Sequence, residues 1–308
     1  MTSPTAPVAV VIVTWNSATF IRGCLLSLRK LERPPHELVV LDNASSDGTA
    51  AIVRQEFPEA RLIERGANDG FCRPNNQGIQ ETTSPFVLVL NPDTTLEPRF
   101  LEELLPAFDD PKVGIAAGKL LRFDGVTLDS CGQMLGLSRQ PIDRGFGKKD
   151  KGQFDKDAEV FGACGAAALY RRAMLDQIAD GPGQYFDESF FAFYEDLDLA
   201  WRAQRAGWRA VYRHRAVGRH ARGGASAAAG PRRYTSLLSR SPEVRFLVMR
   251  NRWLTILRND RRDDFLRNLP FVVMRDKLML GAIAMTSPSV LARLWRERAE
   301  FVKALRKG

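Results

Sequence analysis

The sequence has few cysteines and histidines and no long apolar run, and each scarcity excludes a class of protein. Its four cysteines lie far apart and none forms a C-x-x-C pair, which argues against a zinc site. No stretch reaches the roughly 18 apolar residues that a membrane-spanning helix needs, and charged residues at 275–277 interrupt the nearest candidate, Leu269–Met285. The first residues lack the basic region and cleavage site of a signal peptide, so we predict a strand over Val8–Thr14. We therefore expect a cytoplasmic protein with reduced thiols.

Acidic residues are scarce only toward the C-terminus. The chain carries a formal net charge of +9 over 308 residues, but residues 231–308 hold 18 basic and 7 acidic residues, whereas residues 1–230 hold 27 and 29. This distribution excludes a uniformly basic nucleic-acid-binding body, and neither a stacking platform nor a nucleic-acid motif accompanies the charge. We expect no nucleic-acid partner.

In residues 231–308 arginines alternate with large apolar residues, as in EVRFLVMRNRWLTILRND and VLARLWRERAEFVKALRKG. This pattern is typical of amphipathic helices that lie on an anionic membrane surface. The protein would then be peripheral at the inner face of the cell membrane. Helices packed against the rest of the chain with an arginine-rich outer face, or a homodimer formed through that face, fit the same pattern.

Apolar runs rich in Val, Ile and Leu alternate with amphipathic stretches through the first 120 residues. The apolar runs that mark the predicted strands are Val8–Val13, Leu38–Leu41, Arg61–Ile63, Phe86–Leu90 and Val113–Ala117. Farther along the chain, Arg209–Arg213 is predicted to be another strand. Apolar runs separated by helices indicate an α/β protein with a Rossmann-like, mostly parallel sheet flanked by helices and buried on both faces. Residues 121–160 are rich in glycine and charge and are predicted to form mobile loops, and GGASAAAG at 223–230 is predicted to be a flexible linker.

Polar segments follow three of the predicted strands at the point where each strand ends. These segments are Thr14-Trp15-Asn16, Asp42-Asn43 and Asn91-Pro92-Asp93. Each by itself also fits a turn or a helix cap. In parallel sheets, however, ligands bind at the carboxyl ends of the strands, so the three together predict a binding site.

Five motifs and a later histidine occur in one order along the chain. They are VVIVTWNS, VVLDNASSDGT, NDGFCRPNNQGI, VLVLNPDT and YFDESFFAFYEDLDLAWRAQRAG, followed by His220. Their order resembles that of the family 2 glycosyltransferases, and among these the bacterial rhamnosyltransferase-like enzymes, over residues 8 to about 225. The resemblance implies a GT-A catalytic domain at 1–230, with a nucleotide-binding half at about 1–120 and an acceptor half at about 121–230. A basic, amphipathic, helical C-terminal region would occupy 231–308.

The resemblance also implies a reaction. The protein would be an inverting, metal-dependent hexosyltransferase that moves a sugar from a nucleotide diphosphate donor to a hydroxyl group, with dTDP-L-rhamnose as the first candidate donor. The acceptor would be a cell-surface polysaccharide or a lipid-linked saccharide. A UDP- or GDP-sugar-dependent enzyme of the same family and a non-catalytic nucleotide-sugar-binding relative are the alternatives.

Asn91-Pro92-Asp93 is similar to the D-x-D motif of the family, with Asn91 in place of the first aspartate. The resemblance implies that Asp93 and His220 bind Mg²⁺ or Mn²⁺, an ion that neutralises charge on a diphosphate leaving group. His214 is the competing candidate for the late histidine. A turn cap is the alternative role for Asp93.

Asp196 matches the general base of the family, the group that takes the proton from the acceptor hydroxyl. It lies in the first turn of a predicted helix, whose N-terminus favours the ionised carboxylate. The alternative is an acidic turn that only satisfies the helix dipole.

Further matches imply contacts with the two substrates. Donor contacts are implied for Thr14, Trp15, Asn16, Asp42, Asn43, Asn68, Gly70, Phe71, Asn75, Asn91, Asp93 and Arg219. Acceptor contacts are implied for Cys164, Gly165, Tyr194 and Glu195. Asp47 fits a helix cap at least as well as a ligand contact, and Arg73 and Arg222 are further candidates for binding phosphate oxygens.

Overall fold

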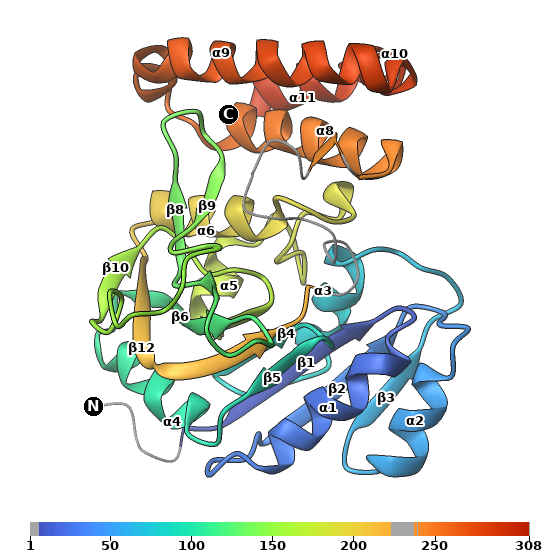
Figure 1. Ribbon diagram of the computed structural model, residues 1–308, viewed down its shortest axis with the longest axis vertical. Helices are drawn as coiled ribbons and strands as arrows, with labels where there is room; N and C mark the ends of the chain where they lie inside the picture. Colours follow the sequence, from blue (N-terminus) through green and yellow to red (C-terminus); the bar gives the residue numbers. More distant parts are fainter. Residues whose placement is uncertain (1–5, 223–236, 239, 308) are drawn as a thin grey trace.

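The computed structural model describes residues 6–222, 237–238 and 240–307, so the predicted linker at 223–230 lies outside the described residues. The centre of the described part is a ten-stranded mixed sheet in the order β10-β12-β6-β11-β4-β1-β2-β3, with β5 beside β12 and β7 beside β6. Figure 1 shows helices flanking this sheet and a further helical layer, α8 to α11, at one end of the molecule.

The elements follow one another along the chain with these bounds. The strands are β1 (Val8–Thr14), β2 (Glu37–Asp42), β3 (Arg61–Glu64), β4 (Phe86–Leu90), β5 (Thr94–Leu96), β6 (Val113–Leu121), β7 (Leu128–Ser130), β8 (Gln133–Leu135), β9 (Pro141–Asp143), β10 (Ala158–Val160), β11 (Ala167–Arg171) and β12 (Arg209–His220). The α-helices are α1 (Ala18–Arg29), α2 (Thr49–Glu56), α3 (Cys72–Gln80), α4 (Phe100–Leu104), α5 (Arg172–Ile178), α6 (Glu195–Arg205), α8 (Pro242–Asn259), α9 (Arg262–Thr286), α10 (Pro288–Arg296) and α11 (Arg298–Lys307).

The N-terminal half confirms the predicted parallel sheet. β1 pairs in parallel with β2 and β4, and β2 pairs in parallel with β3. β4 is buried along its whole length, as a strand covered on both faces should be. In the register of β1 and β2, Thr14 lies opposite Asp42. The polar ends of these two strands therefore lie side by side.

The other half of the sheet is mixed, and its last strand is longer than predicted. β11 enters between β4 and β6 and runs antiparallel to both. β12 extends beyond the predicted strand Arg209–Arg213 and reaches His220, because it pairs with β6 and β5. In the register of β12 and β5, His220 lies opposite Thr94, the residue after Asp93. This pairing places the late histidine beside Asp93.

The prediction of mobile loops over residues 121–160 is wrong for much of that segment. It contains β7, the β8–β9 hairpin and β10, and Leu128 and Asp129 are fully buried. The Arg144 guanidinium lies 4.7 Å from the ring centre of Phe154 and 5.2 Å from that of Tyr212, which ties the segment to β12. The contact with Tyr212 comes from a distant strand, so local composition did not reveal it.

The first helix of the C-terminal region, α8, is anchored to the rest of the protein by buried polar side chains. The Arg252 side chain is fully buried, pairs with Asp276 at 2.9 Å and donates to the carbonyl oxygen of Arg139. On the same helix, Asn259 donates to the Asp198 carboxylate of α6 at 2.6 Å. Packing against the rest of the chain, one of the alternatives for residues 231–308, is thus confirmed for α8.

Helix α9 forms the outer surface of the helical layer. Its exposed apolar side chains include Leu266, Met274, Leu278 and Met285, which are 53% to 82% exposed. Among the helices that the structure describes, none alone has the length and apolar composition to cross a bilayer. α9 and α10 meet that condition only together, and the pair is bent by 117°.

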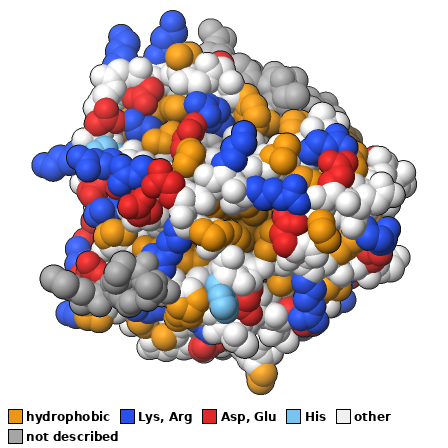
Figure 2. Space-filling view, turned by 90° about the horizontal axis from the view of Figure 1, so that it is seen from below, with side chains coloured by type: hydrophobic (Ala, Val, Ile, Leu, Met, Phe, Trp, Pro, Cys, Tyr) orange, Lys and Arg blue, Asp and Glu red, His pale blue; other side chains and the backbone are white. Residues whose placement is uncertain are grey.

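Both signs of charge are mixed on the face opposite the helical layer, which Figure 2 shows. Ion pairs of the N-terminal half include Arg22 on α1 with Glu56 on α2, and Arg29 on α1 with Glu59 just after α2. Exposed pairs of this kind contribute little to stability.

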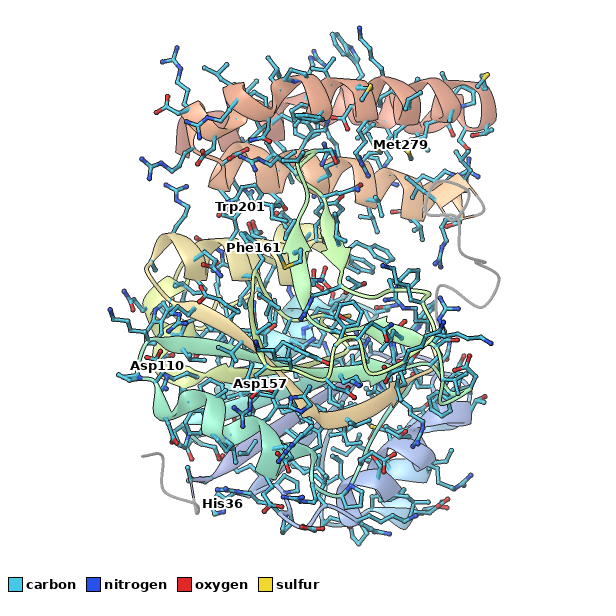
Figure 3. All side chains as sticks on the ribbon, turned by 60° about the vertical axis from the view of Figure 1, so that its left-hand side comes forward. His36, Asp110, Asp157, Phe161, Trp201 and Met279 are labelled. Atoms are coloured by element: carbon cyan, nitrogen blue, oxygen red, sulfur yellow. The ribbon has the colours of Figure 1, made fainter. Side chains whose placement is uncertain are left out.

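Figure 3 shows Met279 within the helical layer, and Trp201 and Phe161 beneath that layer.

Candidate active site

The end of β2 carries a buried carboxylate, Asp42, which is 2% exposed. Its oxygens accept hydrogen bonds from the Thr14 hydroxyl at 2.8 Å and from the Ser45 backbone N–H at 2.9 Å. The pairing of β1 with β2 brings Thr14 to this position. Thr14 therefore orients the predicted donor contact Asp42, and its hydroxyl is already engaged.

The loop after β1 is held by the loop after β2. Asn16 has a φ of 49°, and its Oδ1 accepts from the Ser46 N–H at 2.9 Å. The Asp47 carboxylate accepts from the N–H groups of Ala18 and Thr49 at 2.9 and 3.1 Å, so it has the capping role that was one of its two predicted alternatives. Trp15 beside them is 56% exposed and presents its indole ring to solvent.

A short backbone contact joins the predicted nucleotide loop to the segment before Asp196. Gly70 has a φ of +78°, and a Cβ at this position would lie 2.4 Å from the Phe191 carbonyl oxygen. That same oxygen accepts from the Phe71 N–H at 2.6 Å. The Asn43 side-chain amide donates to the Gly70 carbonyl at 2.7 Å, and the Gly70 N–H donates to Asn68 Oδ1 at 3.0 Å. Glycine is required here for close approach as well as for its φ.

Helix α3 supports the same junction. The Asn75 side chain donates to the Phe71 carbonyl at 2.8 Å, so it holds the loop from within. Asn76 exchanges two hydrogen bonds of 2.8 Å with the backbone of Phe186. Arg73, a candidate phosphate contact, instead pairs with Glu188 at 2.9 Å.

His220 lies between two carboxylates at the end of β12. Its Nε2 is 3.3 Å from Asp93 Oδ1, and its Nδ1 is 2.9 Å from Asp129 Oδ2. Burial opposes the charged form, but the hydrogen bonds to Asp129 and Asp93 outweigh it and raise the pKa of His220 to about 9. Asp129 was not predicted as a site residue from the sequence, because it lies in a segment predicted to be loop.

The two arginines around His220 point in different directions. Arg222 donates to the Asp129 carboxylate and, at 3.0 Å, to the Asp143 carboxylate. Arg219 forms an ion pair with Glu97 on β12's other side, because neighbouring residues of a strand face opposite ways. The donor contact of Arg219 stays a prediction, and Arg222 is the arginine that joins the His220 cluster. His214 pairs with Asp157 at 2.7 Å, away from Asp93.

Asp93 and His220 offer an oxygen and a nitrogen that face each other. In metal sites the other ring nitrogen of a ligating histidine is commonly held by a carboxylate, as Asp129 holds Nδ1 here. In the part of the chain that the structure describes, no three His, Cys, Asp or Glu side chains gather in a metal-binding group. The pair therefore fits an ion that takes its remaining ligands from elsewhere. A diphosphate would be a suitable source.

Asp196 lies at the beginning of α6, and three hydrogen bonds fix its carboxylate. Oδ2 accepts from Gln133 Nε2 at 2.7 Å and from the Gly165 N–H at 3.2 Å, and Oδ1 accepts from the Leu197 N–H at 2.7 Å. Burial and the neighbouring charge of Asp143 raise the pKa of Asp196 above its ordinary value. A raised pKa makes a carboxylate a better proton acceptor, provided that it remains ionised.

Two paths connect Asp196 with the Asp93 segment, one through hydrogen bonds and one through an electrostatic contact. The Asn91 N–H donates to the Ala166 carbonyl at 2.9 Å, and Ala166 follows Gly165, which binds Asp196. A second path runs through Asp143, whose charge acts on Asp196 and which binds Arg222 of the His220 cluster. The structure thus brings the predicted metal ligands and the predicted base into one region.

The predicted acceptor residues differ in accessibility. Tyr194 and Glu195 are each only 8% exposed, and Tyr194 packs in the core, so neither presents an open surface. Burial and the charge of Asp196 raise the pKa of Glu195 to about 8. Burial likewise raises the pKa of Cys164, so that side chain remains a thiol. Phe191, at 39%, is the exposed side chain of this segment.

The segment before Asp196 is conformationally strained and is clamped by α8. Phe191, Phe193 and Tyr194 have φ values of 63°, 72° and 72°, and such conformations cost on the order of 1–3 kcal/mol each. The buried amide of Asn251 donates to the carbonyls of Phe190, Ala192 and Phe193. The strain therefore persists because the C-terminal region over-determines the loop. No local pattern in the sequence singles out Asn251.

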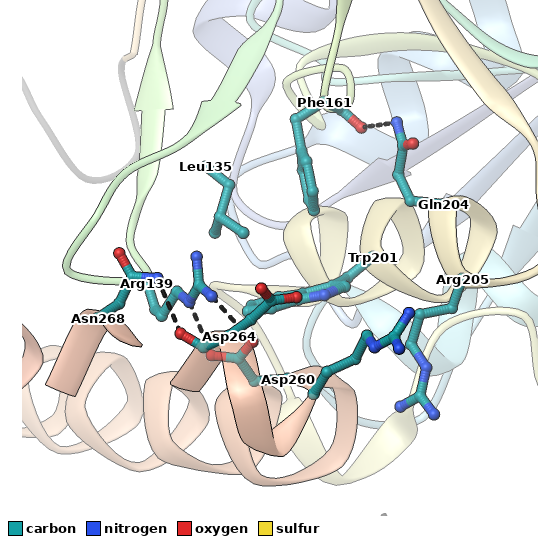
Figure 4. Close-up of a pocket in the computed structure, with 10 residues that line it drawn as sticks. Leu135, Arg139, Phe161, Trp201, Gln204, Arg205, Asp260, Asp264 and Asn268 are labelled. Carbon is teal, nitrogen blue, oxygen red and sulfur yellow. Dashed lines mark hydrogen bonds and ion pairs between the residues drawn. The ribbon is translucent and has the colours of Figure 1, made fainter. Parts of the chain in front are cut away.

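A cavity of about 650 Å³ lies on the side of α6 that faces the C-terminal region (Figure 4). Leu135 and Arg139 of the β8–β9 hairpin line one side of it, and Trp201 lines the other. The guanidinium of Arg139 pairs with Asp260 at 2.7 Å. The hairpin that supplies Gln133 to Asp196 is thus joined to the link between α8 and α9.

A Rossmann-like parallel half, a histidine–aspartate pair at a strand end and a carboxylate at a helix N-terminus are the arrangement expected of a glycosyltransferase of the GT-A fold. The family can be stated more narrowly. The chain belongs to glycosyl transferase family 2, whose pattern matches residues 9–179 and therefore ends before Asp196.

Two relatives illustrate the similarity at the level of sequence. The N-acetylglucosaminyl-diphospho-decaprenol L-rhamnosyltransferase of Mycobacterium tuberculosis is 30% identical over 227 residues, which cover 66% of this chain and 72% of that protein. The low-salt glycan biosynthesis hexosyltransferase Agl10 of Haloferax volcanii is 26% identical over 203 residues, covering 64% of this chain and 61% of that protein.

Solved structures share the fold at lower identity. The mannosyltransferase PcManGT from Pyrobaculum calidifontis, in complex with GDP-Man and Mn²⁺, matches with a TM-score of 0.57 and 17% identity over 99% of this chain and 85% of that one. S. aureus TarS 1-349 in complex with UDP-GlcNAc matches with a TM-score of 0.58 and 20% identity over 97% and 79% of the two chains. These likenesses confirm the predicted GT-A architecture.

Proposed function

We propose that this glycosyltransferase is an inverting, divalent-metal-dependent hexosyltransferase, with dTDP-L-rhamnose as its donor and a hydroxyl of a lipid-linked saccharide as its acceptor. The observation that supports the proposal most directly is the 3.3 Å distance between His220 Nε2 and Asp93 Oδ1. The hydrogen bonds of Asn91 with Ala166 and of Gly165 with Asp196 join this end of the sheet to Asp196. The rhamnosyl donor and lipid-linked acceptor are supported by the similarity to the mycobacterial N-acetylglucosaminyl-diphospho-decaprenol L-rhamnosyltransferase.

Asp93 and His220 would hold Mg²⁺ or Mn²⁺. When bound, the ion supplies positive charge against the diphosphate leaving group. Asp129 accepts from Nδ1 of His220 and keeps Nε2 directed at Asp93. Arg222 already forms an ion pair with Asp129, and its positive charge balances the carboxylates of this cluster. The GDP-Man and Mn²⁺ complex of a protein with the same fold supports a metal here.

Asp196 would be the base. In a single displacement the acceptor oxygen forms a bond to the anomeric carbon, its proton passes to the Asp196 carboxylate, and the nucleoside diphosphate leaves with the electrons of the broken C–O bond. Gln133 and the Gly165 N–H hold the carboxylate in place for that transfer. Its raised pKa suits a proton acceptor.

The donor would lie along the ends of β1, β2 and β4. The exposed Trp15 ring offers a stacking surface for the base, and Asp42, fixed by Thr14, offers carboxylate oxygens to the base or ribose. A UDP- or GDP-sugar is the second candidate donor, since proteins of the same fold carry UDP-GlcNAc and GDP-Man.

The proposed location is the inner face of the cell membrane, with the outer side of α9 on an anionic surface. The exposed apolar side chains of α9 and nearby exposed cations such as Arg267 support it. Co-sedimentation of the full chain with anionic vesicles should fall when Met274 and Leu278 are changed together to glutamine. Recovery that does not change would contradict the location and leave the proposed reaction untouched.

Donor identity can be tested directly on the full chain. Thermal unfolding with dTDP-rhamnose, UDP-GlcNAc and GDP-mannose, each with and without Mn²⁺, should show the largest rise in Tm for dTDP-rhamnose with metal. A larger rise with UDP- or GDP-sugars would transfer the proposal to that donor. A donor-induced rise in Tm without transfer to any saccharide would favour the non-catalytic relative.

A further inference from the structure

A groove of about 450 Å³ lies among α8, α9, α10 and α11, outside the site described above. Its described lining includes Trp253 on α8, Leu280 on α9, Leu291 and Leu294 on α10, and Phe301 on α11. Among the described lining residues only Arg298 carries a charge. A volume of this size accommodates a small organic ligand, and the lining selects one that is almost purely hydrocarbon.

One end of the groove is marked by an exposed aromatic side chain and a cation. Trp295 is 69% exposed, and the Arg298 guanidinium lies 4.8 Å from the centre of its ring. Arg298 also donates to the Trp295 carbonyl at 3.0 Å, which holds it at the rim. An apolar lining with an arginine at its mouth is complementary to a hydrocarbon chain that ends in a phosphate.

This rim is connected to the loop before Asp196. Glu297, the neighbour of Arg298, accepts from Arg250 Nε at 2.7 Å, and the same guanidinium donates to the Ser189 carbonyl at 2.8 Å. On the groove's inner wall, Met249 belongs to the cluster against which Phe193 packs. The groove therefore begins beside the segment that leads to the proposed base.

We propose that this groove is the subsite for the hydrocarbon chain of a lipid-linked acceptor, and that Arg298 binds the phosphate that carries the chain. The inference rests on the proposed function, because it assigns the acceptor to the lipid-linked class. The chain lies between helices, the phosphate lies at the rim, and the saccharide extends along the Arg250-bound loop toward Asp196. The groove thereby distinguishes a lipid-linked saccharide from the free saccharide.

Farnesyl phosphate is a suitable probe, because its binding needs neither donor nor metal. Titration into the full chain should change the tryptophan fluorescence, since Trp253 and Trp295 line the groove. We expect Leu280→Gln to weaken binding at least tenfold. The matched control Leu278→Gln, on the same helix but at a side chain that is 62% exposed, should leave it unchanged. Leu280→Trp, which fills the groove with an apolar side chain, should weaken binding as well and covers the case in which Leu280→Gln fails to fold.

The proposed contact between Arg298 and the phosphate is tested by comparing a ligand that has the phosphate with one that lacks it. Arg298→Gln should weaken farnesyl phosphate at least fivefold and leave farnesol within twofold. Equal effects on both ligands would overturn the assignment of Arg298. In transfer assays, an acceptor with a farnesyl diphosphate anchor should have a lower KM than the same saccharide as a methyl glycoside, and Leu280→Gln should remove that difference without changing kcat for the methyl glycoside.

Three results would overturn the proposal that the groove binds the hydrocarbon chain of the acceptor. One is farnesyl phosphate binding that Leu280→Trp leaves unchanged. Another is equal weakening by Leu278→Gln and Leu280→Gln, which would assign the ligand to the outer, bilayer-facing surface. The third is a wild-type dimer in sedimentation equilibrium that Leu280→Gln dissociates, which would make a second copy of the chain the occupant. None of these three results depends on rhamnosyl transfer. A failure of that transfer would therefore contradict the proposed function and leave the lipid subsite untouched.

Discussion

The side-chain nitrogen of Asn251 lies 2.9 Å from the carbonyl oxygen of Phe193, three residues before Asp196. The same nitrogen reaches the carbonyls of Phe190 and Ala192, so one buried amide of the C-terminal region holds a loop with positive φ values. The loop in turn offers the Phe191 carbonyl to the nucleotide loop. Helix α8 thereby holds the loop that joins the two substrate sides of the proposed site.

Asn251→Ala should lower kcat by about tenfold to a hundredfold, because a small displacement of the strained loop misplaces Asp196. The KM for the donor should change less than kcat, because the hydrogen bonds that hold Asp42 come from Thr14 and Ser45 and not from α8. Steady-state kinetics with both substrates varied would separate the two effects. Asn268→Ala, whose amide bonds only within α9, is the matched control and should retain wild-type kcat.

Asp196→Asn should reduce kcat by about a hundredfold to ten-thousandfold, because the isosteric amide keeps the shape but cannot accept the proton. In the wild type, kcat/KM should fall as the pH decreases through the folded-state pKa of Asp196, which burial and Asp143 raise above the ordinary aspartate value. A pH–rate profile measures that midpoint. Asp176→Asn, on the exposed face of α5, should leave the profile unchanged, and wild-type transfer by Asp196→Asn with intact donor binding would refute the base assignment.

Asp129→Asn should weaken Mn²⁺ activation by about tenfold to a hundredfold, because it removes the carboxylate that orients His220. The dependence of initial rate on Mn²⁺ concentration, after treatment with a chelator, gives the apparent affinity. Arg219 and Arg222 form a second comparison in the same assay. Arg222→Gln should weaken activity, whereas Arg219→Gln, on the far side of β12 beside Glu97, should not. An unaltered Mn²⁺ dependence in Asp129→Asn would contradict the metal site.

Glu195→Gln should stabilise the folded protein at alkaline pH, by on the order of 1–3 kcal/mol. Burial and Asp196 raise the folded-state pKa of Glu195 to about 8, above the unfolded value of about 4.5, so the folded state binds the proton more tightly. The stability from this group is complete below about pH 4.5 and is lost as the pH rises toward 8. Urea unfolding at pH 6 and pH 8.5 should show a smaller loss for the variant than for the wild type. A parallel loss in both would contradict the assignment.

Much of the fold follows from local sequence patterns. Continuous apolar runs such as Phe86–Leu90 predicted buried parallel strands, and their polar ends predicted where a ligand binds. The β8–β9 hairpin and β7 escaped prediction, because Asp129 and Gln133 depend on partners on β12 and α6 that no local pattern reveals. The sequence did not reveal that Arg222 rather than Arg219 joins the His220 cluster for a similar reason: the side on which a residue lies is known only once the strand's register is known.

By itself the sequence determined the class of the protein, since the period of its apolar residues and the residues after each strand depend only on local chemistry. Which groups meet was decided by the tertiary structure. The pairing of β12 with β5 placed His220 beside Asp93, and buried polar side chains such as Asn251 turned the basic C-terminal region into a support for the loop before Asp196. These contacts join residues far apart in the chain, and their energy comes from burial and hydrogen bonding that exist only after the strands and helices have packed.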